Sequence, residues 1–351
     1  MDATIWHRQA QRAAQPAPLA TPLCPASLTQ LSTTELATYA GEVSAGLRAI
    51  PLPSGTLSTL SERMAQTVAA SNASSPGSKD IIALDAPFAA GKSTFVKGWA
   101  RKLYRSWVGP MLATDRPVWH PEPHLTAAFI PVVYVTLIAG STVKELNAQI
   151  LTYLGYPSEG LARVTTTRVI AALKAHGVRL IVLDDVHMAK TTSTAGRHTL
   201  DYLKFLNSEL GELGGTLTLV GAWLERGPIL TDPQIHGRLR LFQFQPFSIA
   251  STQHQAQWQD VLRNAEQVVL PYLGKAKPGI LTSCHAGMLW RRTQGYLGDL
   301  AQLVADATVA ALMDRSLTLT RDHLAHVNLS ARAQSSEADI VATQRRPSDV
   351  N

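Results

Sequence analysis

Residues 86–94, Ala-Pro-Phe-Ala-Ala-Gly-Lys-Ser-Thr, constrain the fold of this chain more than any other segment. They follow an apolar stretch at 81–84 and precede a helical pattern, so they lie where a strand turns into a helix. Such a turn points unpaired backbone N–H groups, together with the helix dipole, at a bound polyphosphate. In this pattern Lys92 reaches the terminal phosphates and the hydroxyl of Ser93 ligates Mg²⁺. The segment therefore predicts a phosphate-binding loop in an α/β domain.

The loop departs from the consensus G-x-x-x-x-G-K-[ST], because Ala86 stands where the first glycine is expected. That glycine relieves crowding in the turn, so the substitution could weaken binding. The alternative interpretation is a chance strand-turn-helix with a solvated lysine. If the loop binds ATP, the expected contacts come from its own residues, which are Pro87, Phe88, Ala89, Ala90, Gly91, Lys92, Ser93 and Thr94.

Composition sets broad limits on the class of protein. The chain has 351 residues, 45% of them hydrophobic and 17% charged, which suits one large or two smaller globular domains. Its two cysteines, Cys24 and Cys284, provide neither a disulfide framework nor a metal cluster. No apolar run approaches the roughly 20 residues that span a bilayer, and the first residues lack a secretory layout, so a cytoplasmic protein is expected. A net charge of +6 mildly favours polyanionic partners.

The order of patterns along the chain predicts five regions. Residues 1–27 are rich in Ala, Pro and Gln and are expected to be disordered, and 28–79 form helices and a linker. Residues 80–247 alternate strands and helices, which implies a parallel sheet with crossover helices, and 248–329 are helical. A polar tail at 330–351 is again expected to be disordered. The expected strands are 81–84, 131–137, 178–183 and 216–220, and the expected helices of the sheet domain are 93–107, 142–154, 166–176 and 197–213.

An apolar strand ending in Asp184 and Asp185 predicts the second half of a nucleotide site. Asp184 is expected to hold Mg²⁺ through water, and Asp185 to polarise the attacking water. Two adjacent carboxylates at the end of a buried strand are costly unless a cation lies there. The alternative is a strand that simply leaves the sheet in an acidic turn. ATPases of the AAA+ class usually have glutamate at the second position, so the shorter Asp185 favours ATP binding over fast turnover.

Two later positions bear on catalysis. AAA+ proteins often place a polar sensor residue at the end of the next strand, where this chain has Ala222. Arg238 follows shortly and could reach the ATP of a neighbouring subunit to stabilise charge during phosphoryl transfer. A surface salt bridge is the alternative for Arg238, and Arg240 is the second candidate for the catalytic role.

These segments together resemble the TniB/TnsC family of AAA+ regulators of DNA transposition. The resemblance runs from about residue 80 to 247 and is carried by 132–136, 143–146, 150–156, 177–187, 202–209 and 219–238. It implies a P-loop AAA+ three-layer domain with a parallel sheet, a C-terminal helical lid domain and N-terminal helices. It also carries over the roles of Lys92, Ser93 and Asp184 and, less directly, of Asp185 and Arg238.

In function, the resemblance implies an ATP-loaded protein that forms a homo-oligomer or filament on duplex DNA and activates a DDE-type transposase, with no membrane partner. The substitutions at Ala86, Ala89, Asp185 and Ala222 suggest slow hydrolysis or a binding-only switch. A second hypothesis is a nucleotide switch that acts on a protein partner without DNA. A third is a small-molecule P-loop kinase, which the helical C-terminal region and Arg238 argue against.

Several basic residues are candidates for DNA contact. Lys97, Arg101, Lys102 and Arg105 share one helical face, which is either a phosphate-tracking stripe or a solvated surface. The Pro-rich insertion at 108–129 is a second candidate, although its Trp119 could equally cap the core. His187 follows the carboxylate pair and either reports the state of the γ-phosphate or is an ordinary hydrogen-bonded histidine.

Overall fold

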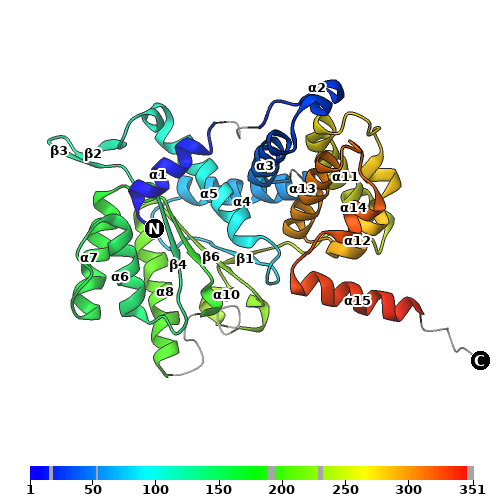
Figure 1. Ribbon diagram of the computed structural model, residues 1–351. Coiled ribbons are helices and arrows are strands. Elements are labelled where there is room, and N and C mark those ends of the chain that lie inside the picture. Colours follow the sequence, from blue (N-terminus) through cyan, green and yellow to red (C-terminus); the bar gives the residue numbers. More distant parts are fainter. Residues whose placement is uncertain (16–18, 53, 189–193, 228–231, 346–351) are drawn as a thin grey trace, which may run out of the picture. The chain divides into compact units, whose positions relative to one another are not determined.

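The structure, a computed structural model, describes residues 1–15, 19–52, 54–188, 194–227 and 232–345. The chain divides into two compact units (Figure 1). The first contains Met1–Gln15, Leu60–Phe88 and Lys92–Phe244, and the second contains Pro16–Thr59, Ala89–Gly91 and Gln245–Asn351. In this division residues 28–59 belong to the same unit as the C-terminal helices.

A five-stranded parallel sheet in the order β4-β5-β6-β1-β7 is the centre of the first unit. The strands are β1 (Ile81–Asp85), β4 (Val132–Thr136), β5 (Leu180–Asp184), β6 (Thr216–Gly221) and β7 (Leu239–Gln243). The side chains of β1, β5 and β6 are buried throughout, as apolar strands covered on both faces should be. The four expected strands are therefore present, and their ends shift by no more than two residues.

Two strand features were not expected from the sequence. Edge strand β7 is absent from the prediction because its Leu-Arg-Leu-Phe-Gln pattern buries only Phe242. The insertion at 108–129 contains a short antiparallel hairpin of β2 (Val118–Glu122) and β3 (Leu125–Ala128). Trp119 packs on Phe129 in this hairpin, and its Nε1 donates to the carbonyl of Ala175 at 3.0 Å. Trp119 thus covers the core of the first unit.

Helices cover both faces of the sheet. The helix α5 (Lys92–Val108) and the helix α8 (Thr194–Glu212) both contact β6, and α8 also contacts α6 (Val143–Leu154) and α7 (Ala162–Ala175). Helix α6 begins with a reciprocal cap between Thr142 and Glu145 and ends at Gly155, whose φ of 84° requires glycine. The leucines of α8 at 200, 203, 206 and 210 recur at helical spacing and are all buried, so they form an apolar stripe. This unit also contains α4 (Gly55–Ala73), which belongs to it from Leu60 onward, and the short α10 (Pro233–His236).

The expected disorder of residues 1–27 is wrong for much of the segment. Helix α1 (Ala3–Arg12) starts at Asp2, whose side chain accepts a hydrogen bond from the N–H of Ile5, and packs against α5. Trp6 is fully buried, and the ring of the buried His7 bonds Tyr104 and the carbonyl of Thr114. The burial of these two side chains orders α1. Residues 16–18 lie outside the described part of the chain.

The second unit is helical and has one hydrophobic core. Its helices are α2 (Pro25–Gln30), α3 (Thr33–Ala49), α11 (Thr252–Val269), α12 (Ala286–Thr293), α13 (Leu297–Met313), α14 (Arg321–His326) and α15 (Ala331–Arg345). Helices α12 and α13 are separated at Gly295, where an added Cβ would meet the carbonyl oxygen of Phe247 at 1.9 Å. Helix α15 occupies most of the tail that was expected to be disordered, and residues 346–351 lie outside the described residues.

Candidate functional site

In the turn after β1, one alanine has a strained backbone conformation. Ala89 has φ 61° and Gly91 has φ 93°, both in the left-handed region. This conformation costs a residue with a Cβ about 1 kcal/mol. Ala86 is buried, its φ is not in that region, and its N–H donates to the carbonyl of Gly221 at 3.3 Å. The expectation that Ala86 crowds the turn is therefore wrong, and the substitution that strains the loop is Ala89.

Replacing Ala89 with glycine should stabilise the fold by about 1 kcal/mol, because glycine adopts this φ without steric cost. Urea unfolding of both proteins measures the difference. Ala86→Gly is the matched control, and it should destabilise by about 0.5–1 kcal/mol because it removes a buried methyl group and frees the unfolded chain. A destabilising Ala89→Gly would show that the loop carries no strain at this residue.

Lys92 is the first residue of α5, and its side chain lies against the loop. It is 7% exposed, its Nζ donates to the carbonyl of Pro87 at 3.1 Å, and it lies 5.4 Å from the ring centroid of Phe88. Burial lowers the pKa of Lys92, and the nearby carboxylates of Asp185 and Asp184 partly offset that effect. The structure therefore brings together the lysine and the carboxylate pair, which are far apart in the sequence. Ser93 follows Lys92 in the first turn of α5 and is half-buried.

The two carboxylates at the end of β5 have different surroundings. Asp184 is buried, and its Oδ1 accepts a hydrogen bond from the N–H of Asp185 at 2.9 Å. Asp185 is half-buried and has φ 57°, a left-handed conformation that Asp and Asn tolerate better than most residues. The backbone thus turns sharply between the two acids and separates their directions. This geometry is compatible with different roles for the two residues.

Two polar residues near these carboxylates were missed in the sequence. The hydroxyl of Tyr134, on β4, donates to Asp184 Oδ2 at 2.5 Å. Asp85, the buried last residue of β1, accepts a hydrogen bond from the N–H of Leu224 at 3.1 Å and lies near enough to Lys92 to raise its pKa. The available signal for Asp85 was its position directly before the loop. Tyr134 gave no such signal, because its contact depends on the pairing of β4 with β5.

His187 connects the loop to the end of β6. Its Nδ1 accepts a hydrogen bond from the N–H of Ala222 at 3.4 Å, and its ring meets Phe88 edge-on, with 5.3 Å between the centroids. These contacts fit the interpretation of an ordinary hydrogen-bonded histidine. Ala222 is buried, so β6 presents a methyl group where a polar sensor was considered.

Arg238 and Arg240 differ in their contacts. Arg238 immediately precedes β7, its side chain is exposed, and no hydrogen bond or ion pair joins its guanidinium to the described residues. Arg240, on β7, donates from Nε to Asp80 Oδ2 at 2.9 Å in an exposed ion pair. The salt-bridge alternative therefore describes Arg240, and Arg238 remains available to a partner molecule.

Residues 114–249 match the family model described as bacterial TniB protein. Over these residues the chain is similar to TniB. The matched residues contain all the stretches that carried the resemblance in the sequence. No curated protein matches the chain significantly.

Solved structures place this TniB-like chain in a fold class. It resembles the Cdc6p protein of Pyrobaculum aerophilum with a TM-score of 0.53 and 14% identity, over 78% of this chain and 66% of that one. It resembles the ORC2 protein of Aeropyrum pernix, solved in ADPNP–ADP complexes, with a TM-score of 0.50 and 12% identity, over 83% and 70%. At these identities the likeness establishes the fold alone. It confirms an α/β domain with a parallel sheet and a C-terminal helical domain.

The TniB match divides the candidate site unequally. The matched residues contain Asp184, Asp185 and Arg238, and they include β6 and β7. The match begins after the loop at 86–94, so the loop lies outside it. The prediction that residues 86–94 bind phosphate therefore depends on the motif and on the geometry described above.

Two of the four cations on the basic face of α5 contact α1 or the residue that follows it. Arg101 lies 5.2 Å from the ring centroid of Trp6 and donates to Gln9, while Arg105 donates to the carbonyl of Ala13 at 2.6 Å. Lys97 lies 5.5 Å from the ring centroid of Tyr134, and Lys102 is exposed. Arg101 and Arg105 therefore help to hold α1 in place.

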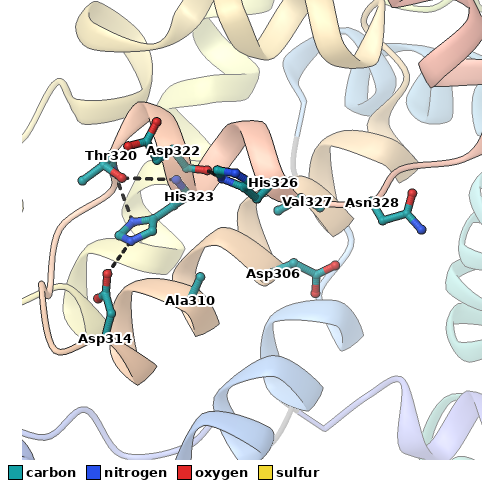
Figure 2. Close-up of a pocket in the computed structure, with 9 residues that line it drawn as sticks. All are labelled: Asp306, Ala310, Asp314, Thr320, Asp322, His323, His326, Val327 and Asn328. Carbon is teal, nitrogen blue, oxygen red and sulfur yellow. Dashed lines mark hydrogen bonds and ion pairs between the residues drawn. The ribbon is translucent and has the colours of Figure 1, made fainter.

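The second unit has a hollow beside α14 with three carboxylates and two histidines, shown in Figure 2. His323 Nε2 contacts Asp314 Oδ2 at 2.7 Å, and the N–H of Thr320 donates to its Nδ1 at 3.3 Å. His326 Nδ1 contacts the carbonyl of Asp322 at 2.8 Å. His326 thus bonds within α14, whereas His323 joins α14 to Asp314 at the end of α13.

Other features limit the choice of site. Arg292 is buried and donates to the carbonyls of Leu324 and Val327, so it holds α14 in place. Within the described ranges, no three histidine, cysteine, aspartate or glutamate side chains gather as a metal-binding group. None of the described helices combines the length and apolar character that crossing a membrane requires.

Proposed function

We propose that this chain binds ATP and Mg²⁺ at the carboxyl edge of its sheet, assembles on duplex DNA when ATP is bound, and recruits or activates a DDE-type transposase. ATP hydrolysis to ADP and phosphate is slow and serves as the switch. The observation that carries the proposal is the convergence of Lys92 with Asp184 and Asp185 beside a strand-to-helix turn.

In this proposal the loop binds the phosphates. The backbone N–H groups of Phe88 to Thr94 surround the polyphosphate at the start of α5, where the helix dipole favours negative charge. Lys92 releases the carbonyl of Pro87 and binds the terminal phosphates instead. Its burial strengthens that contact, because a partly desolvated ammonium interacts more strongly with an anion.

The residues present suit Mg²⁺. Asp184 is a buried carboxylate whose two oxygens each accept one described hydrogen bond, which leaves lone pairs for a metal-bound water. Ser93 is placed one residue after Lys92 for direct ligation. Mg²⁺ in nucleotide sites is held by few protein groups, with phosphates and waters completing the shell, so two protein ligands are sufficient. Bound Mg²⁺ would offset the negative charge of the β- and γ-phosphates.

Asp185 and Arg238 would act on the transferred phosphate. Asp185 polarises the attacking water, and its short side chain on a left-handed backbone limits how well it reaches that water. Slow turnover follows. The exposed Arg238 reaches the ATP of a neighbouring copy, which ties hydrolysis to assembly.

Electron microscopy tests the assembly. The chain should form oligomers or filaments with ATP, Mg²⁺ and duplex DNA, and DNA affinity should fall steeply with salt, because phosphate contacts release counterions with a log–log slope of about −0.9 per contact. Arg238→Ala should keep ATP binding and lose assembly-stimulated hydrolysis. Arg240→Ala is the matched control and should behave as wild type, since exposed ion pairs contribute about 0–1 kcal/mol. Monomers under every condition would overturn the proposal.

The alternative is a nucleotide switch that acts on a protein partner without DNA. The same titration separates the two, because that switch would show ATP binding without salt-dependent DNA affinity. The net charge of +6 and the TniB match favour the DNA-dependent function.

A further inference from the structure

The carboxylate of Asp184 is held at both oxygens. The hydroxyl of Tyr134 donates to Oδ2 at 2.5 Å, and the N–H of Asp185 donates to Oδ1 at 2.9 Å. With one donor on each oxygen, rotation of the carboxylate is restricted.

Sheet register explains why Tyr134 reaches this carboxylate. On β4 and β5, Thr136 pairs with Asp184 and Tyr134 pairs with Val182, so Tyr134 is the diagonal neighbour of Asp184 on the same face. Diagonal neighbours in a sheet lie about 7–8 Å apart, a distance that a tyrosine spans. The contact is therefore determined by the pairing of the strands.

The ring of Tyr134 is itself contacted by side chains of α1 and α5. Trp6 of α1 stacks on it with 5.3 Å between the centroids and 20° between the planes, and Lys97 of α5 lies 5.5 Å from its centroid. Trp6 is fully buried, and Arg101 lies over its ring. A chain of contacts thus leads from α1 through Trp6 and Tyr134 to Asp184.

We infer that Tyr134 is a positioning residue that orients the Asp184 carboxylate toward a nucleotide-bound divalent cation, and that α1 controls this orientation through Trp6. The inference rests on the proposed nucleotide site. It assigns to α1 a role in the response to metal, separate from nucleotide affinity, because neither Trp6 nor Tyr134 belongs to the phosphate-binding loop.

Binding of Mn²⁺ in the presence of ATP, followed by the electron paramagnetic resonance of free Mn²⁺, tests this inference. Tyr134→Phe keeps the ring and removes the hydroxyl, so the dissociation constant for Mn²⁺ should rise about 10-fold or more, as for other partners of metal-binding carboxylates. Affinity for a fluorescent ATP analogue in EDTA should change less than about twofold. The matched control is Tyr272→Phe, which removes a buried hydroxyl that donates to the carbonyl of Ala20 in the second unit and should leave both constants unchanged.

Variants of Trp6 test the second half of the inference. Trp6→Ala should weaken Mn²⁺ binding in the same direction as Tyr134→Phe, and Trp6→Phe, which keeps an aromatic ring, should restore it. The double variant Trp6→Ala/Tyr134→Phe should be no weaker than Tyr134→Phe alone, because the two act on the same contact.

The possible outcomes distinguish a failure of the positioning role of Tyr134 from a failure of the proposed nucleotide site. Wild-type Mn²⁺ affinity in a folded Tyr134→Phe variant that still binds ATP would overturn the positioning role alone. Additive effects of Trp6→Ala and Tyr134→Phe would overturn the control by α1. A wild-type chain that binds no ATP would overturn the proposed function, and this inference with it.

Discussion

Lys92→Ala should raise the dissociation constant for ATP by at least about 100-fold, the largest effect expected from any single substitution in this chain. The lysine would form charge-assisted hydrogen bonds with the terminal phosphates, each worth about 1.5–3 kcal/mol, and every 1.4 kcal/mol is tenfold in affinity. Titration with a fluorescent ATP analogue measures the change.

Two controls make this result specific. Lys102→Ala removes an exposed lysine from the same helix and should leave the affinity unchanged. Thermal unfolding of both variants verifies the fold, because alanine at position 92 leaves the carboxylates of Asp184 and Asp185 without their nearby cation. Undiminished ATP affinity in a folded Lys92→Ala variant would show that the loop does not bind phosphate.

Asp185→Asn should retain ATP binding within about twofold and lower the rate of ATP hydrolysis by about 100-fold or more, as expected for loss of a general base. Asparagine fits the left-handed backbone at φ 57° as well as aspartate does, so the substitution changes the charge without straining the turn. Steady-state release of phosphate measures turnover. The comparison variant is Asp201→Asn on α8, an acid whose side chain is 67% exposed, and it should hydrolyse ATP as wild type does. Equal rates for Asp185→Asn and wild type would remove Asp185 from the proposed mechanism.

The backbone at Asp185 also gives a physical reason for the shorter acid. A left-handed residue with a long side chain is rare, whereas aspartate can compensate through local hydrogen bonds. The glutamate usual in AAA+ proteins would extend farther toward the water but would fit this turn less well. The substitution that lowers the expected catalytic rate is therefore consistent with the local backbone conformation.

Much of the sheet could be predicted from the sequence, because β1, β5 and β6 are apolar runs whose burial on both faces appears directly in the residues. Edge strand β7 could not, since four of its five residues remain at least partly exposed. Helix α1 was missed because its composition indicates disorder and its order depends on two buried side chains, Trp6 and His7. Asp2 at its N-terminus was a usable signal for a helix start.

In the candidate site, too, some residues could be predicted from the sequence and others could not. The phosphate-binding loop and the carboxylate pair are local motifs, so spacing along the chain was enough to find Lys92, Ser93 and Asp184. Tyr134 acts across two strands, and only the register of β4 against β5 brings its hydroxyl to the carboxylate. The strain at Ala89 likewise depends on a backbone angle that the sequence motif does not specify.

The strand order has a consequence for how this chain is made. During synthesis β1 leaves the ribosome first among the five strands, yet its two partners in the sheet are β6 and β7, the last two to appear. Both edges of β1 therefore stay without their native partners until the chain has been translated past Gln243. Long-range parallel pairing of this kind is slow and exposes unpaired edges to aggregation. Strand β1 is thus among the first parts of the sheet to be translated and among the last to pair with its native neighbours.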